Sequence, residues 1–219
     1  MIVELFGLPG SGKTTFVSEF CKTQMDFKNY GTISFIGNSK YNKYKYVFLC
    51  FKPKIFLSLL LLIYSISGKK SSISVKMKDR LISLLYVIYI LDIVYYKKEK
   101  FILDEGLVQA LSAFYIGFDF KENILYIIKK MINRKKYVFC NCNLSFEESL
   151  NRMHNRNRKT ANIDFMDRDE LLKFMTDLSK KNEAIVNIFS EGYSIVNIEM
   201  YNQNEALINL VDSIKEKIW

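Results

Sequence analysis

Eight consecutive residues near the start of the chain have the types and spacing of a phosphate-binding loop. They run from Gly7 to Thr14 and read Gly-Leu-Pro-Gly-Ser-Gly-Lys-Thr, which fits the P-loop pattern of glycine, four free positions and Gly-Lys-Ser/Thr. Glycines let successive backbone N–H groups curl around an anion, and a helix that starts directly after the loop adds its positive dipole end. The residues expected to bind the nucleotide are Gly7, Pro9, Gly10, Ser11, Gly12, Lys13, Thr14 and Thr15.

Two side chains of this loop have further expected roles. The Lys13 ammonium can reach the β- and γ-phosphates and stabilise their charge during transfer, and the Thr14 hydroxyl can hold Mg²⁺. The alternative is a glycine-rich turn that binds nothing. The flanking residues favour the binding site, because Ile2–Phe6 is an apolar strand candidate and Thr15–Cys21 has the apolar spacing of a helix.

A second candidate site is the pair of acids that follows an apolar run. A continuous apolar segment such as Phe101–Leu103 is typical of a buried parallel strand, and open α/β sheets bind ligands at the carboxyl ends of such strands. We therefore expect Asp104 opposite the P-loop, near Mg²⁺ or the phosphoryl acceptor. Asp104 or Glu105 is expected to orient the acceptor hydroxyl or to act as its base. The alternative is that one of these acids caps the helix expected at Leu107–Phe114.

A third candidate begins with what reads as a helix capping box formed by Ser145 and Glu148. Arg152 and Arg156 follow it, four residues apart and on one helix face, where like charges repel. A polyphosphate would relieve that repulsion. We therefore expect both arginines to act on the transferring phosphoryl group, and Arg158 to bind ATP. The alternative is a solvated basic helix end, which the helix dipole favours.

Strand and helix candidates alternate along the rest of the chain. Further strands are expected at Thr32–Gly37, Lys136–Cys142 and Tyr193–Ile198, and further helices at Asn123–Asn133, Glu170–Phe189 and Asn204–Ile218. This alternation favours an α/β fold, namely a P-loop three-layer sandwich with a central, mostly parallel sheet flanked by helices. We expect a single domain over residues 1–219, with a helical middle region at about 41–96 and a lid at about 145–162.

The amino-acid composition limits the cellular compartments and the binding partners that we expect. The chain has 219 residues and a net charge of +9, which can indicate nucleic acid, a membrane surface or phosphorylated small molecules. No aromatic-interleaved RNA motif accompanies the basic clusters, so nucleic acid is not favoured. The apolar stretches Ile55–Ile66 and Leu81–Tyr96 are shorter than the about twenty residues of a membrane span. Four cysteines without CxxC spacing indicate free thiols in a reducing compartment, and with a strand candidate at the very start we expect a cytoplasmic protein without a signal peptide.

In their order, these segments resemble the P-loop kinases of the nucleoside and nucleotide kinase superfamily, and most closely thymidylate-kinase-like proteins. The resemblance rests on Gly7–Thr14, on the strand that ends at Asp104, and on the strand at Tyr137–Cys142 with the arginines after it. It implies ATP and Mg²⁺ as cofactors, an acid that precedes the acceptor site, and an arginine-bearing lid that closes over ATP. Glu105-Gly106 stands where this family often has an arginine, so the resemblance fixes no particular acceptor.

Two classes of function follow. The first is an ATP-dependent kinase that acts on a small molecule such as a nucleoside, nucleotide or sugar, with Lys13, Asp104, Glu105 and the lid arginines in catalytic roles. The second is a P-loop ATPase or nucleotide-dependent switch, in which Glu105 activates water. The expected partners of the first class are ATP and a small phosphoryl acceptor, and a homodimer stays open.

Overall fold

The computed structural model describes the following residues: 1–29, 84, 100–115, 125–126, 128–129, 137–155 and 162–218. Several predictions fall outside this part of the chain. They are the strand at Thr32–Gly37, the middle region at 41–96 apart from Leu84, and the two lid residues Arg156 and Arg158. The helix expected at Asn123–Asn133 is described at residues 125–126 and 128–129, which are helical.

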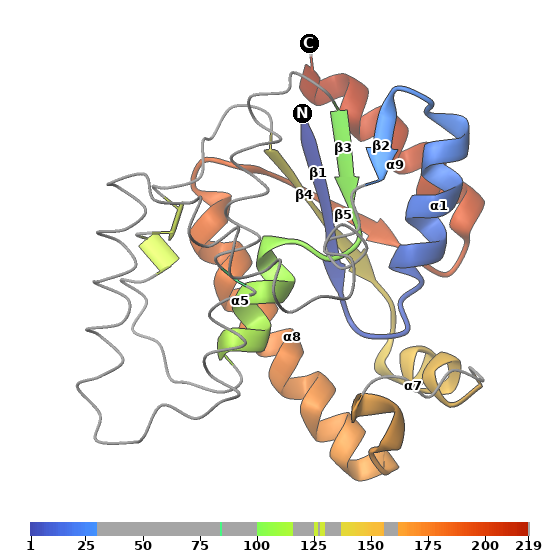
Figure 1. The fold of residues 1–219 in the computed structure, drawn as a ribbon, viewed down its shortest axis with the longest axis vertical. Coiled ribbons are helices and arrows are strands. Elements are labelled where there is room, and N and C mark those ends of the chain that lie inside the picture. The colour runs from blue at the N-terminus through green and yellow to red at the C-terminus, as the bar shows by residue number, and fades with distance from the viewer. Residues whose placement is uncertain are drawn as a thin grey trace, which may run out of the picture.

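The described residues contain a five-stranded parallel sheet in the order β2-β3-β1-β4-β5 (Figure 1). The strand bounds are β1 Ile2–Gly7, β2 Phe27–Asn29, β3 Lys100–Leu103, β4 Tyr137–Asn143 and β5 Ser194–Glu199. Four of these strands confirm the sequence prediction. The sequence did not indicate β2, because it has three residues and only Phe27 is buried, so it forms no apolar run.

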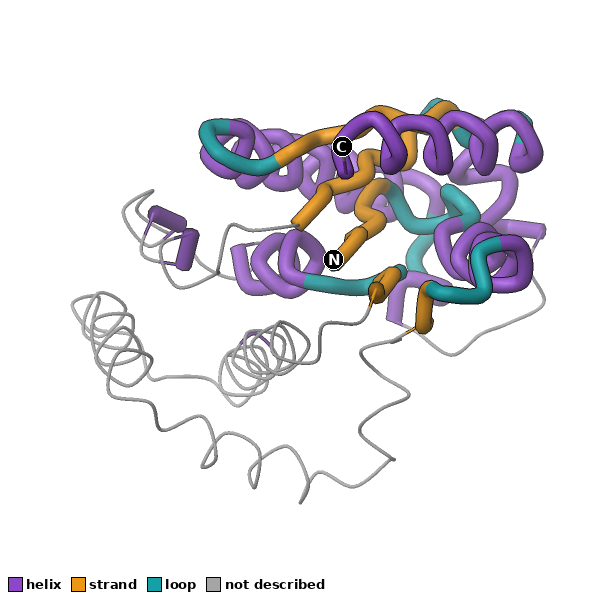
Figure 2. The backbone as a smooth tube through the Cα atoms, turned by 90° about the horizontal axis from the view of Figure 1, so that it is seen from above, coloured by secondary structure: helices purple, strands orange, loops and turns teal. Residues whose placement is uncertain are grey.

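Helices cover both faces of this sheet. Their bounds are α1 Lys13–Thr23, α5 Leu107–Tyr115, α7 Phe146–Asn155, α8 Arg168–Ser190 and α9 Gln203–Ile218, with a 3₁₀ turn at Asn162–Phe165. In Figure 2 the strands form a band with helices on either side. Residues of α1 and α9 pack on one face, and residues of α5 and α8 pack on the other. The predicted three-layer α/β sandwich is therefore confirmed.

Strand β1 is apolar at nearly every position because its alternate side chains enter different layers of the core. In β1, Val3 and Leu5 pack with Phe16 and Phe20 of α1. The intervening residue Phe6 instead joins the cluster of α5 and α8. A parallel strand that is buried on both faces needs apolar residues at nearly every position. Glu4 is the exception in β1, and its side chain is completely buried.

The strand order reverses at β1. The chain builds β2 and β3 on one side of β1 and then adds β4 and β5 on the other side. In doubly wound sheets, ligands bind at the carboxyl ends of the strands on either side of such a reversal. Three predicted site segments follow strands at this edge: the P-loop after β1, Asp104–Gly106 after β3, and α7 after β4.

No helix in the described part of the chain is long and apolar enough to cross a membrane. The stretch Ile55–Ile66 lies outside that part, as does Leu81–Tyr96 apart from Leu84. Among the described cysteines, Cys21, Cys140 and Cys142 are free thiols, as predicted.

Candidate active site

The P-loop has the backbone shape that anion binding needs. Gly10 and Gly12 have φ angles of 82° and 88°, in the left-handed region where a side chain is strained. Gly10 also lies so close to α7 that a Cβ atom on it would be 2.7 Å from the carbonyl oxygen of Ser149. Gly12 is the N-cap of α1, and it forms no side-chain cap hydrogen bond. The first turn of α1 can therefore offer N–H groups to an anion.

Lys13 folds back across its own loop. Its ammonium donates hydrogen bonds to the carbonyl oxygens of Gly7 at 3.1 Å and Leu8 at 2.8 Å, and to Oγ of Ser11 at 3.2 Å. Ser11 is buried, whereas Thr14 and Thr15 are exposed in the first turn of α1. The loop thus holds the Lys13 ammonium at its centre and leaves the Thr14 hydroxyl accessible.

The structure brings the two acids after β3 into the electrostatic neighbourhood of Lys13. Burial lowers the pKa of Lys13, and Cys142, Glu105 and Asp104 partly offset that effect by favouring the charged ammonium. Asp104 and Glu105 are both half-buried. Both acids therefore lie near enough to Lys13 to act on its charge, and their roles at the site stay predictions.

The N-terminus of α5 is capped from β1, a source that the sequence did not indicate. The backbone N–H of Val108 donates to Oε1 of Glu4 at 2.6 Å, and the N–H groups of Leu107 and Gln109 also hydrogen-bond to this carboxyl group. The hydroxyl of Tyr137 in β4 donates to Oε2. Burial raises the pKa of Glu4 to about 7, and these hydrogen bonds oppose the rise. A lone glutamate in an otherwise apolar strand was the available signal for this group.

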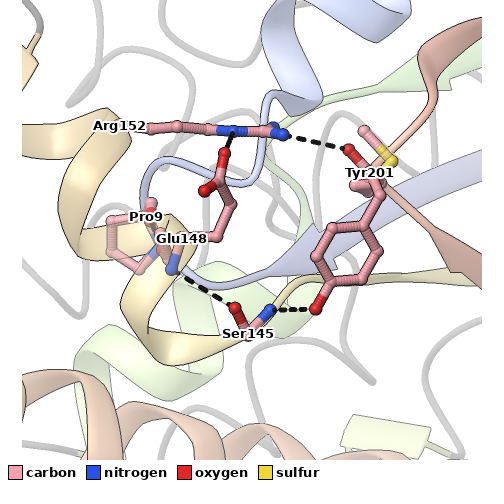
Figure 3. A network of polar contacts seen from close by, with 7 residues as sticks. Pro9, Ser145, Glu148, Arg152 and Tyr201 are labelled. Atoms are coloured by element: carbon pink, nitrogen blue, oxygen red, sulfur yellow. Dashed lines mark hydrogen bonds and ion pairs between the residues drawn. The ribbon is translucent and has the colours of Figure 1, made fainter.

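Helix α7 contacts the P-loop directly, and Figure 3 shows Pro9 of the loop beside this helix. The hydroxyl of Ser149, which is fully buried, donates to the carbonyl oxygen of Pro9. Leu8 of the loop packs in a cluster with Leu150 and Met153 of α7. Sequence reasoning missed this contact, since nothing in the local pattern distinguishes Ser149 from a solvent-facing serine.

Half of the predicted capping box forms at the start of α7. The N–H of Glu148 donates to Oγ of Ser145 at 3.2 Å. The reciprocal bond is not made, because the N–H of Ser145 donates to the hydroxyl of Tyr201 at 3.1 Å (Figure 3). The Glu148 carboxylate accepts from Nε of Arg152 at 2.9 Å instead. The prediction of a full box was therefore wrong, because both of its remaining partners find competing bonds.

Arg152 joins α7 to the end of β5. Besides its ion pair with Glu148, its Nη2 donates to the carbonyl oxygen of Met200 at 3.4 Å. Its side chain is 30% exposed, so its remaining guanidinium N–H groups can reach a ligand at this edge of the sheet. Because Arg156 and Arg158 lie outside the described residues, the joint action of the three arginines stays a prediction.

Comparisons with known proteins agree with this geometry at the level of the fold. No protein-family model and no curated protein matches the sequence. Solved structures do match. Deoxyadenosine kinase from M. mycoides with bound dATP is 14% identical with a TM-score of 0.60, over 98% of this chain and 100% of that one. Thymidylate kinase from Candida albicans is 15% identical with a TM-score of 0.60, over 99% of this chain and 91% of that one.

A third match is the YorR protein from Bacillus subtilis in complex with phosphorylated GDP. It is 11% identical with a TM-score of 0.56, over 99% of this chain and 97% of that one. The fold is that of the P-loop nucleoside and nucleotide kinases. Identities this low establish the shared fold, and the chemistry of this chain has to be argued from its own residues.

Within this kinase fold, the donor atoms at the site suit Mg²⁺. No group of three or more His, Cys, Asp or Glu side chains that could hold a metal ion occurs among the described residues. Thr14 and Asp104 offer a hydroxyl and a carboxylate after neighbouring strands. Mg²⁺ prefers oxygen ligands and is usually held by one or two protein side chains together with substrate phosphates. The two residues therefore fit the metal that the sequence predicts.

Proposed function

We propose that this chain is a kinase that transfers the γ-phosphoryl group of ATP to a nucleoside or nucleotide. The observation that carries the proposal is the convergence of the P-loop lysine, Lys13, with Asp104 and Glu105 at the point where the strand order reverses. The likeness in fold to nucleoside and nucleotide kinases supports the choice of acceptor class.

Each residue at this edge has a role in the proposed reaction. The P-loop N–H groups hold the phosphates, and the Lys13 ammonium leaves its own carbonyl partners to bind the β- and γ-phosphates. Mg²⁺, held by Thr14 and Asp104, would neutralise phosphate charge. Asp104 or Glu105 orients the acceptor hydroxyl and accepts its proton. Arg152, together with Arg156 and Arg158 of the lid proposed at 145–162, stabilises the transferring group and excludes water.

A P-loop ATPase is the second candidate. It is favoured by Glu105, a half-buried carboxylate whose charge acts on the phosphate-binding lysine and which could activate a water molecule. Such a protein would hydrolyse ATP without any acceptor, and its nucleotide state would control a partner. The two candidates differ in what receives the phosphoryl group, so one assay separates them.

The test is ADP release from Mg·ATP with a panel of nucleosides, nucleotides and sugars, and without any of them. We expect slow release with ATP alone and a large rise with one nucleoside or nucleotide. Lys13→Ala should abolish that rise and leave the fold intact, because Lys13 is a phosphate-binding charge and no part of the core. Lys22→Ala, on the exposed side of the same helix and paired with Glu19, is the matched control.

Two outcomes would change the assignment. Release at full rate without any acceptor would favour the ATPase, and loss of that release in Glu105→Gln would support water activation. Near-normal turnover by Lys13→Ala would remove the P-loop from the mechanism. The single-domain organisation, the lid and a cytoplasmic location remain parts of the proposal alongside the kinase activity.

A further inference from the structure

A buried carboxyl group lies beside the strand and the turn that carry the acid pair of the site. Glu4 is opposite Leu103 in the parallel pairing of β1 with β3, so it stands beside the last residue of the strand that delivers Asp104. Its side chain is fully buried on the sheet face that α5 covers. There its carboxyl group accepts a hydrogen bond from the N–H of Val108 at 2.6 Å and further hydrogen bonds from the N–H groups of Leu107 and Gln109. The start of α5 is thus fastened to the central strand.

The turn between β3 and α5 fits closely over this carboxylate. A Cβ atom at Gly106 would be 2.4 Å from Cδ of Glu4 and 2.6 Å from its Oε2. Such distances are not compatible with any side chain larger than hydrogen unless Glu4 moves. Glycine is therefore required at position 106 as long as Glu4 keeps its place, and the Gly106 backbone packs against the Glu4 side chain.

A second group fixes Glu4 itself. The hydroxyl of Tyr137 donates to Oε2 from β4, on the opposite side of β1 from β3. Tyr137 is buried in an aromatic cluster with Phe139 and Tyr193, so its ring has little freedom. The carboxyl group is consequently held from both sides: by the helix N-terminus that follows β3 and by the phenol of β4.

We propose that Glu4 is a positioning residue, which acts through the Asp104–Glu105–Gly106 turn to hold the acid pair opposite Lys13. The proposal rests on the proposed function insofar as it concerns catalysis. Glu4 touches neither substrate nor phosphate, because it is sealed beneath the turn. Its effect on the reaction is through the angle and distance at which the two acids meet the P-loop, where a displacement of about 1 Å can cost a hundredfold in rate.

The test compares Glu4→Ala with Glu4→Gln in the full chain. The amide oxygen of glutamine can still accept the N–H groups of α5, so Glu4→Gln keeps the cap and alanine removes it. We expect Glu4→Ala to lower kcat for phosphoryl transfer by about ten- to a hundredfold while the KM for ATP changes little, since the P-loop is intact. Glu4→Gln should restore most of the rate.

A second variant keeps the test valid should alanine prevent folding. Tyr137→Phe removes one hydrogen bond to Glu4 and leaves the carboxyl group in place, so kcat should fall several-fold. Its matched control is Tyr193→Phe in the same aromatic cluster, where the hydroxyl donates to the carbonyl oxygen of Lys129 and leaves Glu4 untouched. This control should keep the wild-type kcat.

Amide hydrogen exchange at Leu107–Gln109 supplies a readout that does not depend on activity. We expect faster exchange there in Glu4→Ala and near-normal exchange in Glu4→Gln. Unchanged kcat in Glu4→Ala, or equal loss in the alanine and glutamine variants, would overturn the positioning role. If the wild-type protein phosphorylates no acceptor, the proposed function fails by itself. Amide exchange at Leu107–Gln109 then still decides whether Glu4 holds the turn. Equal exchange rates in Glu4→Ala and Glu4→Gln would show that it does not.

Discussion

Ser149 of α7 donates a hydrogen bond to the carbonyl oxygen of Pro9, so the helix within the proposed lid is fastened to the phosphate-binding loop. The contact is partly buried: Ser149 is fully buried, and Gly10 beside it leaves no room for a side chain. The same helix is tied through Arg152 to the end of β5. A nucleotide that orders the loop would therefore act on α7 directly.

Ser149→Ala should loosen this contact and weaken nucleotide binding. The half-buried Pro9 carbonyl would lose its donor, and a hydrogen bond of this kind contributes about 0.5–1.5 kcal/mol of stability. We expect a lower Tm and a several-fold higher KM for ATP, measured by thermal unfolding and initial rates. Ser18→Ala, on the exposed face of α1, is the control and should change neither quantity. A normal KM in Ser149→Ala would mean that the loop keeps its shape without α7.

Substitutions at Asp104 and Glu105, the two acids after β3, are expected to have different effects on activity. Asp104→Asn should lose far more activity than stability, because it removes a charge near Lys13 and no part of the core. For a kinase, we expect it to raise the Mg²⁺ concentration needed for half-maximal rate. Glu105→Gln should then have the smaller effect on Mg²⁺ dependence. Equal Mg²⁺ dependence in wild type and Asp104→Asn would contradict the metal role of Asp104.

Arg152 forms an ion pair with Glu148 and is proposed to bind the nucleotide. Two variants distinguish its structural role from its binding role. Arg152→Ala should reduce nucleotide affinity by removing a cation from the site. Glu148→Gln weakens the same ion pair while leaving the arginine in place, so it should keep or increase that affinity. Both changes should cost little stability, since exposed ion pairs contribute about 0–1 kcal/mol. Parallel effects of the two variants on ATP binding, measured by calorimetry, would assign Arg152 a purely structural role.

Glu4 predicts how stability depends on pH. Its pKa is about 7 in the folded chain against a reference value of 4.5, so folding disfavours the ionised form. The contribution of protonated Glu4 to the free energy of unfolding is fully present below pH 4.5 and is lost as the pH rises through about 7. For a pKa shift of this size, that contribution is about 3 kcal/mol. The free energy of unfolding in urea should therefore decline from pH 5 to 8 in wild type relative to Glu4→Gln. Parallel pH profiles for the two proteins would contradict the raised pKa.

The P-loop and the acid pair could be predicted from local sequence. A loop such as Gly7–Thr14 is expected to bind phosphate through its own backbone and the helix that follows, so its proposed function is encoded in consecutive residues. The buried strand before Asp104 was recognisable because parallel strands are apolar on both faces. The prediction of a full capping box at Ser145 was wrong, because Tyr201, 56 positions away, accepts the Ser145 N–H, and Arg152, one turn further along α7, takes the Glu148 carboxylate.

The sequence by itself determined which groups could carry chemistry in this protein: a loop lysine, two acids at a strand end and an arginine-rich segment, each in the context of a parallel α/β sheet. The tertiary structure decided what holds them in place. Glu4 lies 104 positions before the Val108 amide that it binds, and Ser149 lies 140 positions after Pro9. Contacts of that range follow from strand order and register, because only the packed sheet brings β1, β3, β4 and α7 to one edge.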